Sequence, residues 1–534
     1  MRVSPMLSRA VIAALALGGM VATPVNAAER PEFVAADRDA SARMASDVHA
    51  RQPDGSTALQ WAAYGGDVDE VRRLIAAGAD VNARNDFGAS AMSVAAAAGN
   101  AAVIQALLKG GADPESPNTE GQTALMAVAR TGSVEAARAL LKAGADVNAK
   151  ERWGGQTALM WAASQRQPEM IRVLLKAGAR VDERGKVNDW ARKVTAEPRE
   201  KAMDRGGFAA IHYAAREGCI ECIRALLDGK ADVDRGDGFG TPPLVLALMN
   251  LRFDTAKALI EWGADVNLWD FHGQTPLYAA IDTNRVPRGA RPDVPSTDTT
   301  TGLDIAELLI ARGANVNAQL KLRLPGRAMP GDRNGEFRTQ TTGATPLMRA
   351  AVACDLPAIE LLLKHGALVD LPISDGTTPL FGTVIGSNTR ARDKSENDAL
   401  AALRLLKAAG ADPAKAVGQG WRTLHIIHLH TMDQARVPGT TLLMMAVARD
   451  WKRVVRLLAE WGVDLDAKDS DGLTALDYAM GRQRYGYLQV KPPPVPGMEA
   501  VLRELGAKVE NPSAAPWPPL SVPQITARVP EVLY

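Results

Sequence analysis

The chain has 534 residues, of which 46% are hydrophobic, 23% charged and 5% aromatic, and its formal net charge is +1. This composition is too apolar for a disordered chain and too polar for a bundle of membrane helices. The near-zero charge excludes a strong whole-chain attraction to nucleic acid or to an acidic surface. The length indicates either several domains or a repeat array, in which each unit contacts only its neighbours.

The N-terminus has the pattern of a secretory signal peptide. Arg2 and Arg9 supply the positive region, residues 10–21 are apolar, and Val25, Asn26 and Ala27 place small residues at a cleavage site. We therefore expect residues 1–27 to be removed and the mature protein to be periplasmic or secreted. The alternative is an uncleaved anchor, although the apolar stretch is short for a bilayer. No later segment is apolar enough to span a membrane, so we expect no integral segment after cleavage. Residues 28–53 form a lead-in or cap.

Two series of glycines divide the chain that follows. The first series recurs every 33 residues where nothing is inserted, as between Gly55 and Gly88. The second series, which begins at Gly78, follows the first by 23 residues in uninterrupted units. The two series stay in phase over eleven units. The first series comprises Gly55, Gly88, Gly121, Gly155, Gly207, Gly240, Gly273, Gly343, Gly376, Gly439 and Gly472.

Each unit predicts a pair of helices. In the third unit, Thr123 can cap a helix over residues 124–130, and Gly132 ends it. A second helix follows, with apolar residues spaced three and four apart on one face, and Gly144 ends it in a left-handed cap. A single pair cannot bury its apolar face, so neighbouring pairs are expected to stack into an all-α solenoid.

The pattern resembles the ankyrin repeat. The period, the Gly-x-Thr-Pro-Leu beginning and the Gly-Ala-Asp-Val-Asn ending all match, and the resemblance covers residues 54–508. It implies an ankyrin-repeat solenoid of about eleven helix–turn–helix units with β-hairpin fingers, three of them extended. It also implies a non-enzymatic scaffold that binds another protein through its concave face and its fingers, and the signal peptide adds that this scaffold is an exported, bacterial-type member of the family.

One family feature is mostly replaced. The histidine that often follows Thr-Pro-Leu is retained only in the fifth unit, as His212, and we expect each replacement to cost one side-chain hydrogen bond. The replacements are Gln60, Met126, Met160, Tyr278, Met348 and Phe381.

Insertions interrupt the period at two kinds of place. One group lies between units and should extend the fingers, where a binding role is as plausible as a solvated loop. Its segments lie near residues 185–205, 319–342 and 414–438. The other group lies between the two helices of a unit and is expected to form tolerated surface loops. These loops lie near residues 285–300, 387–396 and 482–497, and a proline-rich tail at 509–534 should be extended.

The candidate partner-binding residues lie at finger tips and after first helices. Aromatic residues are typical anchors of protein contacts. The alternative is that these rings pack on the next finger. The tip candidates are Phe87, Trp153, Phe239, Trp269, Phe271 and His272. The candidates after first helices are Tyr64, Arg130, Gln165 and Asp282, and Arg323 and Arg327 make the second extended finger basic.

Catalytic and metal-binding patterns are weak. Cys219 and Cys222 have redox spacing, but no thioredoxin-like pattern surrounds them, so two core-filling thiols are favoured over a disulfide. His425, His428 and His430 lie close in sequence without a zinc spacing, which makes them weak metal candidates.

The sequence contains no nucleophile elbow, phosphate loop or zinc-protease motif. We therefore expect no catalytic residues, no cofactor, no nucleic-acid partner and a monomeric protein. The alternatives are a metal- or thiol-dependent periplasmic enzyme or redox protein, a small-ligand binder on the aromatic tips, and a polyanion binder that uses Arg323 and Arg327. Binding of the last kind would vanish at moderate salt.

Overall fold

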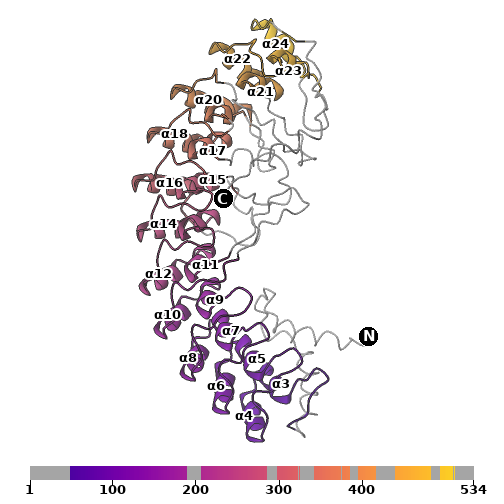
Figure 1. The fold of residues 1–534 in the computed structure, drawn as a ribbon, viewed down its shortest axis with the longest axis vertical. Coiled ribbons are helices and arrows are strands. Elements are labelled where there is room, and N and C mark those ends of the chain that lie inside the picture. Colours follow the sequence, from indigo (N-terminus) through magenta and orange to yellow (C-terminus); the bar gives the residue numbers. More distant parts are fainter. Residues whose placement is uncertain are drawn as a thin grey trace, which may run out of the picture. The chain divides into compact units, whose positions relative to one another are not determined.

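The computed structural model describes residues 48–188, 206–284, 298–322, 324, 342–374, 376–384, 395–415, 439–482, 493–508 and 510–511. These residues form short helices that pair in chain order, from α3 with α4 to α23 with α24 (Figure 1). They fall into two compact units, the first ending at Ala264 and the second beginning at Asp265. No helix of this described part is long and apolar enough to cross a membrane.

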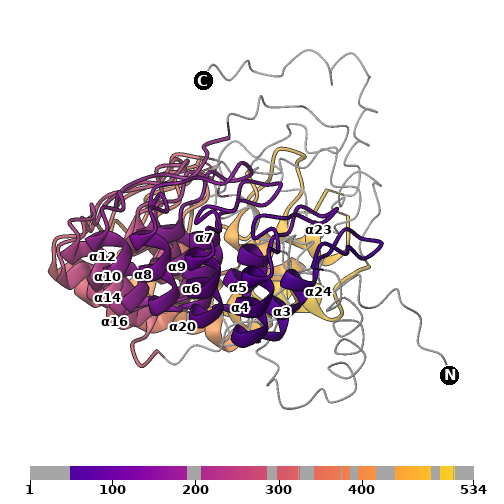
Figure 2. The same cartoon turned by 90° about the horizontal axis from the view of Figure 1, so that it is seen from below.

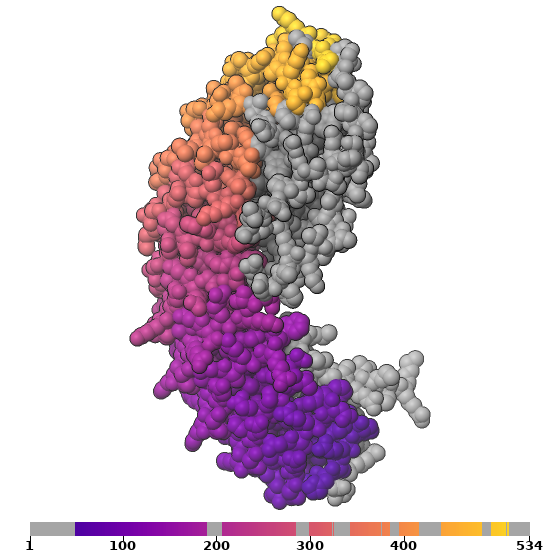
Figure 3. Space-filling view, in the orientation of Figure 1, coloured from indigo at the N-terminus to yellow at the C-terminus, as the bar shows by residue number. Residues whose placement is uncertain are grey.

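In the first unit, the first helix of each pair stacks on the first helix of the next pair, and the second helices do the same (Figure 1). The first helices are α3 (Ala58–Gly65), α5 (Ala91–Ala98), α7 (Ala124–Thr131), α9 (Ala158–Ser164), α11 (Ala210–Glu217) and α13 (Pro243–Met249). The second helices are α4 (Val68–Ala76), α6 (Ala101–Lys109), α8 (Val134–Lys142), α10 (Pro168–Lys176), α12 (Ile220–Asp228) and α14 (Phe253–Glu261). Within the first unit, successive repeats follow one another in chain order in the space-filling view (Figure 3).

The second unit continues the same pairing. Its helices are α15 (Pro276–Asn284), α16 (Gly302–Ala311), α17 (Pro346–Ala353), α18 (Leu356–Lys364), α19 (Pro379–Gly382), α20 (Glu396–Ala408), α21 (Leu442–Ala448), α22 (Lys452–Glu460), α23 (Ala475–Ala479) and α24 (Met498–Glu504). Prolines begin α15, α17 and α19, where the missing N–H costs no helical hydrogen bond.

Two columns of apolar side chains form the core of the first unit. Small residues at one position of the first helices let neighbouring helices approach closely, and leucines at one position of the second helices fill the space between the two rows. All of these side chains are fully buried, and each buried leucine contributes about 1.5–3 kcal/mol. The columns are Ala63, Ala96, Ala129, Ala163 and Ala215, and Leu74, Leu107, Leu140, Leu174, Leu226 and Leu259.

Glycine occupies the left-handed position in the turn between the two helices of several pairs. Gly132 has φ +79°, and a Cβ there would lie 2.4 Å from the side-chain oxygen of Gln167. The left-handed backbone favours glycine at this position, while Arg166 and Leu251 adopt a similar backbone, with φ of 58° and 59°, in the corresponding turns of other pairs.

Asparagine side chains join neighbouring repeats at the base of the fingers. The Asn148 amide donates to the carbonyl of Gly178 over 3.1 Å, and its oxygen accepts from the N–H of Arg180 over 2.8 Å. Asn82, Asn267 and Asn317 make the same pair of bonds to the repeats that follow them. These bonds satisfy backbone groups that the end of a second helix would otherwise leave unpaired.

Basic side chains join neighbouring fingers. The Arg51 guanidinium donates to the carbonyl of Gly55 in its own finger and to the carbonyl of Arg84 in the next, over 3.1 and 2.9 Å. Arg84 repeats the arrangement toward Gly88 and Pro117. The fingers project to one side of the helices (Figure 2). Among the described residues, the fingers contain isolated antiparallel β-bridges, such as those that join Arg51 to Thr57 and Val187 to Gly206.

The replacement of the family histidine does not remove a hydrogen bond from every repeat, so that expectation is wrong as stated. The Gln60 oxygen accepts from the N–H of Thr57 over 2.8 Å, and its amide donates to the carbonyls of Ala83 and Ala89 in the next finger. Sulfur atoms of Met126 and Met444 accept from the corresponding capping N–H groups. Glutamine provides both an acceptor and a donor on one side chain, as histidine does.

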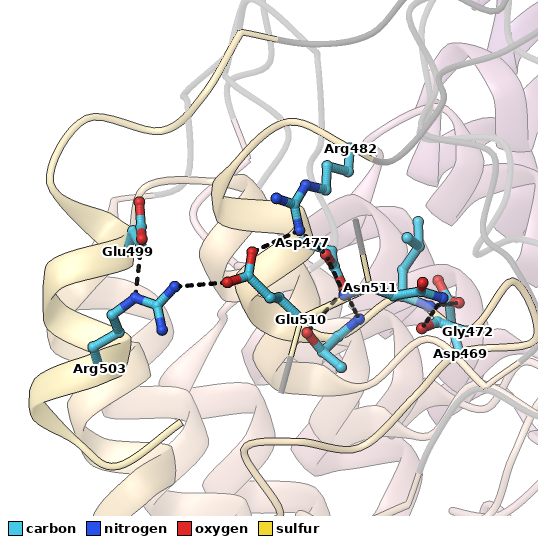
Figure 4. A network of polar contacts seen from close by, with 10 residues as sticks. Asp469, Gly472, Asp477, Arg482, Glu499, Arg503, Glu510 and Asn511 are labelled. Carbon is cyan, nitrogen blue, oxygen red and sulfur yellow. Dashed lines mark hydrogen bonds and ion pairs between the residues drawn. The ribbon is translucent and has the colours of Figure 1, made fainter. Parts of the chain in front are cut away.

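A polar network closes the C-terminal end of the second unit (Figure 4). The buried carboxylate of Asp477 accepts hydrogen bonds from the N–H of Thr474, from Arg482 and from the N–H of Asn511. Glu510 pairs with Arg482 over 2.9 Å and with Arg503 over 3.0 Å. Residues 510–511 therefore contact the last helix pair where a further finger would otherwise lie.

The fold predicts a pH-dependent stability that originates at His212. Its side chain is fully buried and its Nδ1 accepts from the N–H of Ala209 over 3.0 Å. Burial, together with the nearby positive charge of Arg184, lowers the pKa of His212 from 6.5 to about 4. Below pH 6.5 the unfolded chain therefore binds a proton that the folded chain does not, so stability falls as the pH falls from 6.5 toward 4.

As the pH falls from 7.5 to 5, protonation of His212 in the unfolded chain should lower the free energy of unfolding by about 2 kcal/mol. The His212→Gln variant, which copies Gln60, should fold at pH 7.5 and lose stability less steeply in urea titrations at the lower pH. Parallel pH profiles for the two proteins would contradict the assignment.

Candidate partner-binding surface

Buried asparagine and aspartate side chains close the finger tips. The Asn85 oxygen accepts from the N–H groups of Phe87 and Ala89 over 3.1 and 2.9 Å. Asp237 accepts from Phe239 and Thr241 over 2.7 and 2.8 Å. Because one acceptor holds two N–H groups, the residue before the repeat glycine has a fixed position at the tip.

The fourth finger is built differently because it contains one extra residue. The spacing from Gly121 to Gly155 is 34 residues rather than 33. The buried Glu151, whose side chain is longer than that of asparagine, accepts from the N–H groups of Trp153, Gly154 and Gln156 over 2.6, 2.8 and 2.8 Å. The longer loop leaves Trp153 84% exposed, the largest exposed fraction among the large apolar side chains of the described residues.

The other candidates of the first unit are accessible to different degrees. Tyr64 and Phe87 are 37% and 38% exposed. Gln165 is exposed as well, whereas Arg130 and Phe239 are half-buried. The aromatic tips therefore divide into exposed rings and one partly packed ring.

In the second unit, one finger gathers three candidates. Trp269 and Phe271 are 48% and 43% exposed, and His272 is half-buried. The Lys321 ammonium lies 3.9 Å from the centre of the Trp269 ring, and the Phe271 and His272 rings meet edge to face at 5.4 Å. A cation therefore already contacts one of the exposed aromatic rings.

One expected surface residue is instead buried. Asp282 is 8% exposed and pairs with Arg349 of the next helix pair, because α15 and α17 pack together there. Arg323, Arg327, His425, His428 and His430 lie outside the described residues. Across the described ranges, no three His, Cys, Asp or Glu residues lie close enough to hold a metal ion.

Sequence reasoning missed part of the surface of the first helices. The Arg130 guanidinium lies 5.9 Å from the ring centre of Trp161, and Arg216 lies 5.2 Å from that of Tyr213. Trp161 and Tyr213 are half-buried and occupy the same position, four residues after the helix cap. Their common position in the repeat could have indicated a shared surface. The sequence alone favours core packing for a tryptophan inside a helix, so this surface was not predicted. Val187, 48% exposed, was also missed.

The preference for two separate core-filling thiols at Cys219 and Cys222 is wrong. Both side chains are buried, but they form a disulfide, with a Cα–Cα distance of 5.2 Å. Cys219 caps α12, and its sulfur accepts from the N–H of Cys222 over 3.2 Å. The cap and the third helical residue face each other at a helix start, which brings the two sulfurs together. Cys354 is buried and lies outside this disulfide.

Family models identify the repeats directly. The model described as ankyrin repeats in three copies matches residues 34–118, 92–184, 194–270 and 211–320, and a single ankyrin-repeat model matches residues 342–373. These matches cover more than half of the chain. The chain belongs to the ankyrin-repeat family, whose fold is typical of non-enzymatic scaffolds for protein interactions.

Curated relatives share the repeats over part of their length. The chain is 31% identical over 193 residues to the B-cell lymphoma 3 protein homolog of Mus musculus, covering 35% of each. It is 31% identical over 343 residues to the nuclear factor NF-kappa-B p105 subunit of Gallus gallus, covering 58% of this chain and 31% of that protein. It is 27% identical over 314 residues to the E3 ubiquitin-protein ligase KEG of Arabidopsis thaliana, covering 52% and 18%. The chain thus spans between 18% and 35% of the length of these relatives.

A solved structure also matches. The crystal structure of the ankyrin repeat domain of Bcl-3, described as a unique member of the IkappaB protein family, has 26% sequence identity and a TM-score of 0.35. The match covers 42% of this chain and 94% of that domain.

We predict that Glu151 sets the shape of the fourth finger. Glu151→Ala would leave three N–H groups without their carboxylate, which should cost about 1–3 kcal/mol of local stability. Hydrogen exchange measured by mass spectrometry should become faster across residues 151–156. Glu120→Ala, at the exposed tip of the neighbouring finger, is the matched control and should leave the exchange unchanged. Equal protection in both variants would disprove the role of Glu151.

Proposed function

We propose that this protein is an exported, non-enzymatic scaffold that binds another protein through the concave face and the finger tips of about eleven ankyrin units. The supporting observation is where the large apolar side chains are exposed. Of the seven in the described residues, Phe87, Trp153, Val187, Trp269 and Phe271 belong to fingers. Exposed aromatic side chains held in one place are the usual anchors of a protein interface.

The fingers hold these anchors in a preformed arrangement. Backbone bonds join neighbouring fingers, such as the N–H of Lys186 to the carbonyl of Gly154 over 2.6 Å and that of Gly238 to Gly206 over 2.9 Å. Tip carboxylates and amides fix the loops between them. A surface that is ordered before association loses less conformational entropy when a partner binds. The three insertions between units, with Arg323 and Arg327, would extend this surface.

The relatives support the same role. Curated proteins with matching repeats include the NF-kappa-B p105 subunit and the B-cell lymphoma 3 protein homolog, in which the matched region is a fraction of the whole. We infer that the shared property is the repeat array as a binding frame. The activities in the names of longer relatives belong to those proteins.

Removal of the finger anchors should abolish partner capture. In affinity capture from the periplasmic extract of the source cells, the Trp153→Ala, Phe239→Ala, Phe271→Ala triple variant should retain less than about a tenth of the wild-type partner, because truncated anchors cost about 2 kcal/mol or more each. Leu368→Ala, which removes a 56% exposed side chain outside the finger tips, is the control. Undiminished capture by the triple variant would rule out the aromatic tips as the binding site.

Export is proposed from the N-terminal pattern, and the disulfide between Cys219 and Cys222 supports it because disulfides persist in oxidising compartments. We expect the mature protein to begin at Ala28 and to be recovered from the periplasm or the medium. Denatured without reductant, it should react with one equivalent of a thiol reagent, at Cys354, and with three after reduction. A chain that retains Met1 and has three reactive thiols in the cytoplasm would refute export.

A further inference from the structure

In the first unit, the first helices carry more positive than negative side chains. Across α3, α5, α7, α9, α11 and α13 and the turn at Gln165, the ionised side chains are Arg130, Arg166, Arg216 and Glu217. The second helices instead combine both signs, as in α4, where Arg72 and Arg73 pair with Asp69 and Glu70. The surface of the first helices is therefore positive, with a single carboxylate.

These arginines occur once per repeat over three consecutive repeats. Arg130 and Arg216 lie in the last turns of α7 and α11, and Arg166 follows α9. The three helices pack directly on one another. We name the set Arg130, Trp161, Arg166, Tyr213 and Arg216 the Arg–aromatic row.

The aromatic residues hold two of the guanidinium groups in place. Arg130 lies over Trp161, and Arg216 lies over Tyr213 and also donates to Glu217 over 2.9 Å. Gln156 donates to the Tyr213 hydroxyl over 2.6 Å, which fixes that ring. Among the described residues, no carboxylate forms an ion pair with Arg130 or Arg166. A guanidinium stacked on a ring keeps its N–H edge available for a carboxylate.

We propose that the Arg–aromatic row is a docking site for an acidic segment of the partner protein. Carboxylates of the segment pair with Arg130 and Arg166, and its apolar side chains lie on Trp161 and Tyr213. This proposal rests on the proposed scaffold function and adds the chemistry of the partner. Arg130 is half-buried, so less water screens its pair with a carboxylate, whereas Arg166 is exposed and its pair is more strongly screened.

The spacing also constrains the segment. Stacked helices lie about 8–10 Å apart, and an extended chain rises about 3.3 Å per residue. One guanidinium per repeat therefore matches an acidic residue about every three positions, with apolar residues between. A nucleic acid or a sulfated polysaccharide presents charge more densely and has no apolar side chains for the two rings.

The test uses phage-displayed random twelve-residue peptides selected on the full mature chain with its disulfide intact. Selected peptides should be enriched in Asp and Glu at intervals of about three, with apolar residues between them. Fluorescence anisotropy with a selected peptide should show at least tenfold weaker binding to the Arg130→Gln, Arg166→Gln variant, because this variant loses both charge-assisted pairs with the peptide.

The matched control removes two arginines from the second helices of the same repeats. Arg138→Gln, Arg172→Gln has the same change in net charge and should bind the peptide as the wild type does. Trp161→Leu should weaken binding while keeping an apolar side chain.

Selected peptides without an acidic excess, or an equal loss in the control variant, would overturn the acidic-segment proposal. The proposal would also be overturned if heparin displaced the peptide and bound the control variant as weakly as it bound the Arg130→Gln, Arg166→Gln variant. In each of these cases the scaffold function survives if the finger-tip variants still lose partner capture. Failure of the scaffold function itself would appear as the absence of any protein captured by the wild-type chain.

Discussion

Every repeat depends on its neighbours to bury its apolar face. A pair of helices of about nine residues each cannot enclose a core by itself, and short helices are marginal without packing. In the first unit the alanine column lets first helices approach, and the leucine column fills the space between the two rows. Since the core lies between consecutive pairs, folding requires the periodic positions and leaves the surface positions free to vary.

Polar side chains at periodic positions also hold the fingers in place. Different residues do this, because the requirement is for an acceptor or donor at a given place rather than for one residue type. Gln60 replaces the family histidine with two kinds of hydrogen bond, and Glu151 replaces an asparagine when the loop is one residue longer. The second case has a consequence for binding, because the longer loop exposes Trp153.

The last helix pair shows what happens where a neighbouring repeat is absent from the described chain. Asp477, at the position of the family histidine, accepts from residues on both sides of its own pair instead of from a following finger. Glu510 and two arginines then attach the chain to the surface of α24. Capping repeats of solenoids commonly have such polar outer faces.

The sequence by itself determined the helix pairs, their caps and the aromatic finger tips, because each depends on residues within one period of about 33. Gly55, Gly88 and the Thr caps mark these positions directly. Tertiary structure alone decided that Asp282 is buried against Arg349, that Cys219 bonds to Cys222, and that Arg130 lies on Trp161. The ion pair and the stacked ring join side chains of different repeats, and the disulfide depends on the rotamers at a helix cap. Their distances follow from how helices stack and side chains orient, which the period does not encode.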